Sequence, residues 1–201
     1  MLKELFELVQ GTAKDSVIDN PEIPNEQNQE VVSEATNTVA SGLRNMVAGG
    51  GLSSILDMFK GGNNKNSLLS NPIVSMMIGH FAGKLISKFN MNGNKANGVA
   101  ASLIPSVLGN LINRSNDSND NGFSLDNLLS SITGGKSREV VQERGGGSIT
   151  DILSQIGGGN SSNDNGGGGL MDIIGQLAGG AQQQQQRNGG SLLDLIKGFA
   201  R

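Results

Sequence analysis

The stretch that decides the fold runs from residue 71 to residue 89 and reads NPIVSMMIGHFAGKLISKF. Asn71 is a good N-cap, and Pro72 stands at the first helical position, where proline is tolerated. Apolar residues follow at helical spacing, and three more widen the stripe: Val74, Met77, Ile78, Phe81, Leu85 and Phe89, then Ile73, Met76 and Ile86. We expect so apolar a helix to be the central one of a bundle. Gly79 and Gly83, four residues apart, would let a neighbouring helix approach closely.

Helices are predicted on both sides of this stretch, and no segment alternates with the period of a strand. The first covers residues 2–14 and ends before residues 20–24, where each proline biases the preceding residue away from the α region. A longer helix starts near residue 25 and stops at glycines 49–51. After a turn at residues 90–94 we expect two short helices that meet near Ile104-Pro105, because an internal proline kinks or divides a helix.

A short unit occurs five times along the chain, beginning at Gly51, Ser124, Ser148, Gly169 and Ser191. Each copy places four apolar residues at i, i+3, i+4 and i+7, which is one face of a helix. The first two copies carry Leu52, Ile55, Leu56 and Phe59, and Leu125, Leu128, Leu129 and Ile132. The last three carry the faces that we predict to contact a partner: Ile149, Ile152, Leu153, Ile156, Leu170, Ile173, Ile174, Leu177, Leu192, Leu195, Ile196 and Phe199.

The ends of the unit are marked as well. Ser148 with Asp151, and Ser191 with Asp194, have the spacing of a capping box. Glycine pairs supply the positive φ that a C-terminal stop requires. The predicted stops are the pairs 134–135, 157–158 and 179–180, and the predicted linkers are residues 118–122, 162–169 and 182–186.

These patterns predict an all-α protein, a small helical bundle with a Gly-rich tail of short tethered amphipathic helices. We expect an N-terminal amphipathic helix in residues 1–19, a helical domain in residues 25–135, and a tail in residues 136–201. The tail helices are placed at about residues 148–157, 169–178 and 191–200. Burying four apolar side chains contributes at most about 6–12 kcal/mol, and ordering roughly nine residues costs about 1–2 kcal/mol each. Because these terms nearly cancel, each unit must dock on the domain, on another unit, on another chain or on a lipid surface.

Composition excludes several classes of function. The 201 residues include 31 Gly and one His but no Cys, which removes cysteine nucleophiles, thiolate metal sites and disulfides. With a single His, no catalytic, metal or cofactor site is predicted. The net charge of −3 is uneven, since residues 1–41 carry two Lys against eight acidic groups and residues 42–144 carry ten basic against six acidic groups. So weak a field disfavours nucleic acid as a partner, because nucleic-acid binding needs clustered Lys and Arg.

Three candidate sites have simpler structural explanations. His80 has no carboxylate or second His at ligand spacing and is expected to be a core or rim residue. Residues 117–122 place oxygens at positions 1, 3 and 5 of a calcium loop, but Leu128 occupies the twelfth position, where a bidentate Glu is required. A basic patch would have few aromatic residues for stacking bases, so the rim of a bundle is favoured. The lysines concerned are Lys60, Lys65, Lys84, Lys88 and Lys95.

Several short motifs follow one another in the second third of the chain, namely Phe89-Asn90-Met91, Ala100, Leu103-Ile104-Pro105, Leu111, Gly122-Phe123-Ser124-Leu125 and Leu128-Leu129. With these motifs, the chain resembles the YidB-like family of bacterial proteins. The resemblance covers about residues 65–135, with the Gly-rich tail as compositional support. It implies a small all-helical domain of uncharacterised function and brings no catalytic residue with it. The acidic N-terminal helices fall outside the pattern.

The leading hypothesis is a non-enzymatic, cytoplasmic bacterial protein that associates with itself or with another protein through its tail helices. Several weak helices on flexible linkers suit multivalent binding. The N-terminus has no signal-peptide pattern, and the most apolar segment, residues 73–86, falls short of the ~20 residues that span a bilayer. The alternative is a peripheral membrane protein whose tail helices lie in the interface. A nucleic-acid binder using Lys84, Lys88 and Lys95 ranks third, and no small-molecule substrate is evident.

Overall fold

The computed structural model describes residues 2–60, 65–117, 123–143, 145–149, 151–152, 170–187, 196 and 198. In this part of the chain the structure is helical and contains no strand, which confirms the all-α class. The helices in chain order are α1 (Leu2–Thr12), the π-helical turn η1 (Lys14–Ile18), the 3₁₀ turn η2 (Asn25–Gln27), α2 (Asn28–Ala48), α3 (Leu52–Lys60), α4 (Lys65–Leu69), α5 (Pro72–Phe89), α6 (Gly93–Asn116), α7 (Leu125–Ile132), α8 (Lys136–Glu143) and α10 (Leu170–Arg187). The sequence patterns did not predict α4 or α8.

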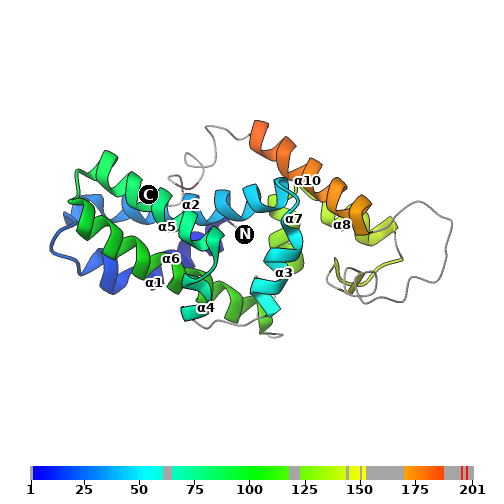
Figure 1. Ribbon diagram of the computed structural model, residues 1–201, viewed down its shortest axis with the longest axis horizontal. Coiled ribbons are helices and arrows are strands. Elements are labelled where there is room, and N and C mark those ends of the chain that lie inside the picture. The colour runs from blue at the N-terminus through cyan, green and yellow to red at the C-terminus, as the bar shows by residue number, and fades with distance from the viewer. Residues whose placement is uncertain are drawn as a thin grey trace.

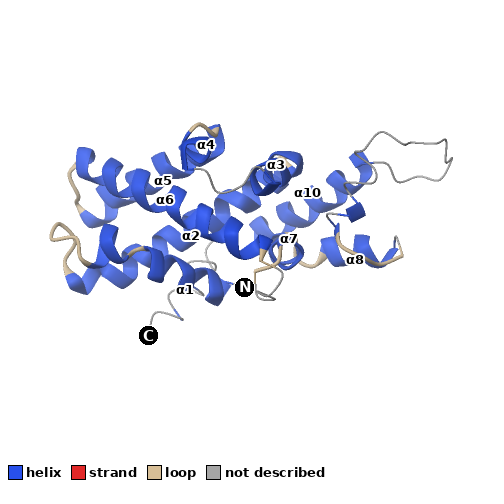
Figure 2. Cartoon of the chain, turned by 90° about the horizontal axis from the view of Figure 1, so that it is seen from below, coloured by secondary structure: helices blue, strands red, loops and turns tan. Residues whose placement is uncertain are grey.

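Four helices pack in a ring at one end of the molecule. α2 contacts α1 and α5, and α6 contacts the same two helices. Consequently α1 and α5 lie on opposite sides of the pair formed by α2 and α6 (Figure 2). Val39, Phe81 and Leu103 are fully buried in the core that these helices share.

The central helix is α2, so the prediction that the helix at residues 72–89 is central is wrong. α2 contacts α1, α3, α5, α6, α7 and α10, whereas α5 leaves Met76 and Ile86 exposed to 66% and 43%. The apolar stripe of α5 did not identify the central helix, because many of the buried residues of α2 are small and not strongly apolar. Ser33, Thr36 and Thr38 are buried, and each hydroxyl donates to the carbonyl one turn earlier at 2.8 Å. A residue that bonds its own helix in this way is buried without being strongly apolar.

α6 is one continuous helix, so the predicted division near Ile104-Pro105 is wrong. Pro105 cannot donate to the carbonyl of Ala101, which removes one backbone hydrogen bond. Packing compensates for this loss, since the residues around the proline have no exposed surface. Those fully buried neighbours are Leu103, Ile104, Val107 and Leu108.

Several helix ends follow the predicted chemistry. The Asn71 side chain accepts from the Ile73 N–H at 2.9 Å, which confirms the N-cap in front of Pro72. Ser124 likewise caps α7 by accepting from the Asn127 N–H at 3.2 Å. After α7, Gly134 and Gly135 have φ of +65° and +92°, which confirms the predicted glycine stop.

A buried ion pair joins α2 to α5. The Glu34 side chain is 1% exposed, and its Oε1 accepts from Nζ of Lys88, whose side chain is 37% exposed. The second carboxylate oxygen, Oε2, has no hydrogen-bond partner among the residues described. Gly42 of α2 lies against Met77 of α5, so the two helices run antiparallel from this pair. The ion pair therefore marks one end of the α2–α5 contact.

Replacing Lys88 with Met should lower the free energy of unfolding by about 2–3 kcal/mol, because Glu34 would keep a buried charge without its partner. The matched control is Lys95→Met, which breaks the half-exposed pair with Glu22. That surface pair should contribute at most about 1 kcal/mol. Urea unfolding followed by circular dichroism measures both variants. Equal losses would show that the burial of Glu34 does not set the strength of its ion pair.

Candidate helix-docking surface

Helices of the repeat gather at one end of α2. α3, α7 and α10 each contact α2, and α3 also contacts the C-terminal part of α6, where Asn116 donates to the Phe59 carbonyl (Figure 1). In every described copy the residue at i+3 is buried. These residues are Ile55, Leu128, Ile152 and Ile173, with exposures of 0%, 2%, 8% and 0%. The repeat therefore acts as one kind of packing unit.

The third copy is linked to the second by a cap. Residues 149, 151 and 152 are helical, and the N–H groups of Asp151 and Ile152 both donate to the Ser148 carbonyl at 3.1 Å. The Ile149 N–H donates to Oδ1 of Asp126 in α7 at 2.9 Å. A carboxylate at a helix N-terminus satisfies a free N–H and complements the helix dipole. Successive units therefore contact one another as well as the rest of the chain.

α10 docks on α2 through a narrow apolar face. Ile173, Leu177 and Ala181, each one turn after the last, have no exposed surface. Ile174 is half-buried and lies beside Gly50, which stands two residues after the end of α2 and has φ of +79°. One polar contact adds to this face, since Nε2 of Gln182 donates to the Ala48 carbonyl at 3.1 Å. We call the surface of α2 and the α7–α8 turn that α10 covers the α10 seat.

α10 is longer than the sequence predicts. It continues to Arg187, so the predicted helix end near residue 178, the stop at Gly179-Gly180 and the linker at residues 182–186 are all wrong. Gly180 is buried and packs against the α7–α8 turn, where a Cβ atom would lie 2.6 Å from Cγ of Lys136. This glycine therefore allows close approach and does not end the helix. Burial of Ala181 and the bond from Gln182 favour the helix beyond it.

The structure places the predicted partner-contact residues in two groups. Five are buried within this chain, namely Ile149, Ile152, Ile173, Leu177 and Ile196, and Ile174 is half-buried. Leu153, Ile156, Leu192, Leu195 and Phe199 lie outside the described residues, as does the side chain of Leu170. A partner or a membrane surface can reach the apolar face of α10 only after α10 leaves its seat.

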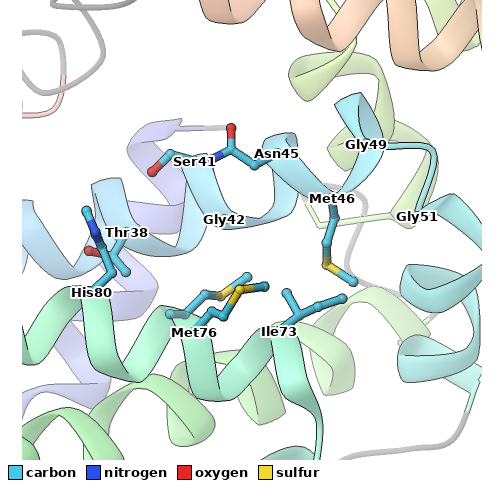
Figure 3. Close-up of a pocket in the computed structure, with 11 residues that line it drawn as sticks. Thr38, Ser41, Gly42, Asn45, Met46, Gly49, Gly51, Ile73, Met76 and His80 are labelled. Carbon is cyan, nitrogen blue, oxygen red and sulfur yellow. The ribbon is translucent and has the colours of Figure 1, made fainter.

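A groove of about 510 Å³ lies between α2 and α5 (Figure 3). Met46, Met77 and Ile73 form its apolar part, and Ser41, Asn45 and the exposed His80 form a polar rim. The buried Thr38 also lines the groove. His80 is therefore a rim residue and not a core residue. The apolar pattern did not predict this groove, although small or polar residues recur at helical spacing along α2 and its C-cap, at positions 38, 41, 42, 45 and 49. Flexible methionine side chains in such a groove suit apolar contacts of varied shape.

The remaining candidate sites gain no support. Lys88 is paired with Glu34 and Lys95 with Glu22, so two members of the basic patch are bound to carboxylates. Leu128, at the last position of the calcium pattern, is 2% exposed in α7, and residues 118–122 lie outside the described residues. Across the described residues, no group of His, Asp or Glu side chains is placed to hold a metal ion. No helix there is long and apolar enough to cross a membrane.

Arg44 is an unusual residue of α2. It is 9% exposed, and its Nε has no hydrogen-bond partner among the residues described. Burial lowers the pKa of this guanidinium because desolvation disfavours its charged form. An arginine nevertheless stays protonated at neutral pH. The buried Nε without a partner therefore counts against the stability of the fold at this position.

Comparisons with protein-family models, with curated proteins and with solved structures found no match to this chain.

Replacing Gly180 with Leu should release α10 from its seat, because the new side chain would overlap the α7–α8 turn. Gly179→Leu is the matched control, since a Cβ atom at Gly179 meets nothing within 4 Å. Hydrogen exchange of residues 170–187 measures the docking. We expect loss of amide protection in the first variant and unchanged protection in the second. Protection retained after Gly180→Leu would contradict the seat described here.

Replacing Arg44 with Met should leave the free energy of unfolding unchanged or raise it, because a partly desolvated guanidinium whose buried Nε has no partner is exchanged for an apolar side chain of similar length. Arg114→Met should lower it by about 0.5–1 kcal/mol through loss of a cation–π contact. The Arg114 guanidinium lies 4.7 Å from the centroid of the Phe123 ring. Urea unfolding compares the two variants. A loss of stability in Arg44→Met would show that the guanidinium has a stabilising contact.

Proposed function

We propose that this chain is a non-enzymatic protein that associates with itself or with another protein through its repeated amphipathic helices. The observation that supports this best is the α10 seat. There, one repeat unit is held against α2 by three fully buried apolar residues, Ile173, Leu177 and Ala181. The other copies carry the same apolar spacing.

A docked helix of this kind is suited to exchange between molecules. Its polar bond to α2 runs from the Gln182 side chain to the Ala48 carbonyl, a backbone group that does not depend on the residue type at position 48. The apolar part of the contact depends on the one-turn spacing of the buried residues in α10. The same helix of a second molecule has the same spacing. Exchange of identical elements is a low-cost route to dimers. Several such helices on one chain add effective concentration to each weak contact.

The proposal also includes a location and a domain organisation for this chain. The location is cytoplasmic. The domains are a helical domain in residues 25–135 with an amphipathic helix before it, and a Gly-rich tail in residues 136–201 that provides the contacts. The resemblance to the YidB-like family is consistent with a helical domain of this size and stays a prediction. The absence of enzymatic activity is also part of the proposal.

The test uses the full-length chain and the double variant Ile173→Ser/Leu177→Ser. Light scattering after size exclusion, over a concentration series, measures the mass. We expect the mass of the parent chain to rise with concentration and that of the variant to rise less, because two buried side chains of the exchanging helix are lost. A pull-down with the parent chain as bait provides a second measurement.

The matched control is Met171→Ser/Gln176→Ser, which changes two exposed positions of the same helix. It should associate as the parent chain does. The same mass for parent, Ile173→Ser/Leu177→Ser and control at every concentration, with unchanged capture on the bait, would overturn the proposal.

A further inference from the structure

One face of α5 is exposed and apolar. In the described part of the chain, the exposed large apolar side chains are Leu69, Met76, Ile86 and Met171, and two of these lie on α5. Met76 is 66% exposed and Ile86 is 43% exposed. α5 lies at the outside of the helix ring, on the side opposite α1 (Figure 2). Its exposed side is therefore open to another molecule.

Two glycines lie between these apolar residues. Met76, Gly79, Gly83 and Ile86 follow one another at steps of three, four and three, the spacing of a seam between two packed helices. Both glycines are exposed, and a Cβ atom at either would meet nothing within 4 Å. The close approach that Gly79 and Gly83 permit is thus not used by the described part of this chain. We call these four residues the α5 seam.

We propose that the α5 seam is the contact between two copies of this chain, with the two α5 helices antiparallel. The order of sizes along the seam is large, small, small, large, and it reads the same in both directions. The seam is centred on position 81 of the sequence. A twofold axis that crosses the exposed side of α5 at the level of this residue places Met76 of one copy opposite Ile86 of the other, and Gly79 opposite Gly83. A self-complementary surface of this kind is what a twofold dimer requires.

Charge also favours the antiparallel pair. Two antiparallel helices set the positive end of each dipole beside the negative end of the other. Lys84 stands across from Ile78 of the second copy in this register, so the two Lys84 side chains are not opposed. Lys88 is already paired with Glu34 of its own chain. Few like charges therefore meet across the seam.

The area available indicates a weak dimer. An 18-residue helix is about 27 Å long and about 10 Å wide, which gives a contact of roughly 270 Å² per copy. A standard interface buries about 800 Å² per partner. Met76 also lines the groove between α2 and α5, so a neighbouring copy covers part of that groove as well. We expect dimers that form reversibly as the concentration rises.

This inference concerns a different surface from the α10 seat, and cysteine cross-linking tests the two separately. The chain has no Cys, so single variants carry one reactive thiol each. Met76→Cys and Ile86→Cys are mixed in equal amounts and treated with a short bis-maleimide. The proposed register predicts that the mixed product, which joins the Met76→Cys chain to the Ile86→Cys chain, exceeds either homodimer severalfold. At the other end of the seam in this mixed dimer, Ile86 of the Met76→Cys chain still lies opposite Met76 of the Ile86→Cys chain.

Added bulk in the seam provides the control. Gly83→Leu, introduced into both cysteine variants, should abolish the mixed product, because Leu prevents close approach of the helices. Gly98→Leu should preserve it, since Gly98 is also exposed and helical with open space around it, but lies on α6. Ile173→Ser/Leu177→Ser in the same background should preserve it as well, which separates the seam from the proposed exchange of α10. A statistical mixture of products, or a mixed product that survives Gly83→Leu, would overturn the inference.

Discussion

The structure depends on the burial of α2 around most of its circumference. Other helices surround it on several sides, and many of its buried side chains are small. Among the polar ones, Ser33, Thr36 and Thr38 each donate to a carbonyl of their own helix. Their hydroxyls need no partner on another helix, so neighbours can pack against them at short distance.

The repeat helices depend on burial as well, because each needs a surface on which its apolar face can pack. A helix of two or three turns gains too little from its own residues to be stable alone, so it forms only where a surface accepts its apolar face. α2 and the α7–α8 turn supply such a surface for α10. Gly134, with φ of +65°, forms the turn, and the buried Gly180 of α10 lies directly against it. One glycine shapes the surface and another fits the helix to it, although both belong to similar Gly-Gly pairs.

That difference explains what could be predicted from the sequence. Periodicity and caps identify most helices, and Asn71, Ser124 and Gly134 act as their chemistry indicates. Tertiary packing decides the rest. Pro105 stays within one helix because its neighbours are buried. α10 continues through Gly180 because Ala181 is buried beyond it and Gln182 bonds to α2. The identity of the central helix and the groove beside it were missed, because apolar content measures burial poorly where small residues are packed closely.

The two surfaces have different consequences for assembly. A twofold contact through the α5 seam occupies the same surface on both copies, so no seam is left for a third chain and assembly stops at a dimer. Exchange of α10 joins two different surfaces, the helix of one molecule and the seat of another, and such a contact either closes reciprocally or continues from molecule to molecule. The seam lies on α5, whereas the seat lies on the end of α2 and the α7–α8 turn, so one contact does not block the other. A chain with both contacts can therefore link dimers into larger assemblies, and loss of the seam alone would leave only assemblies built by exchange.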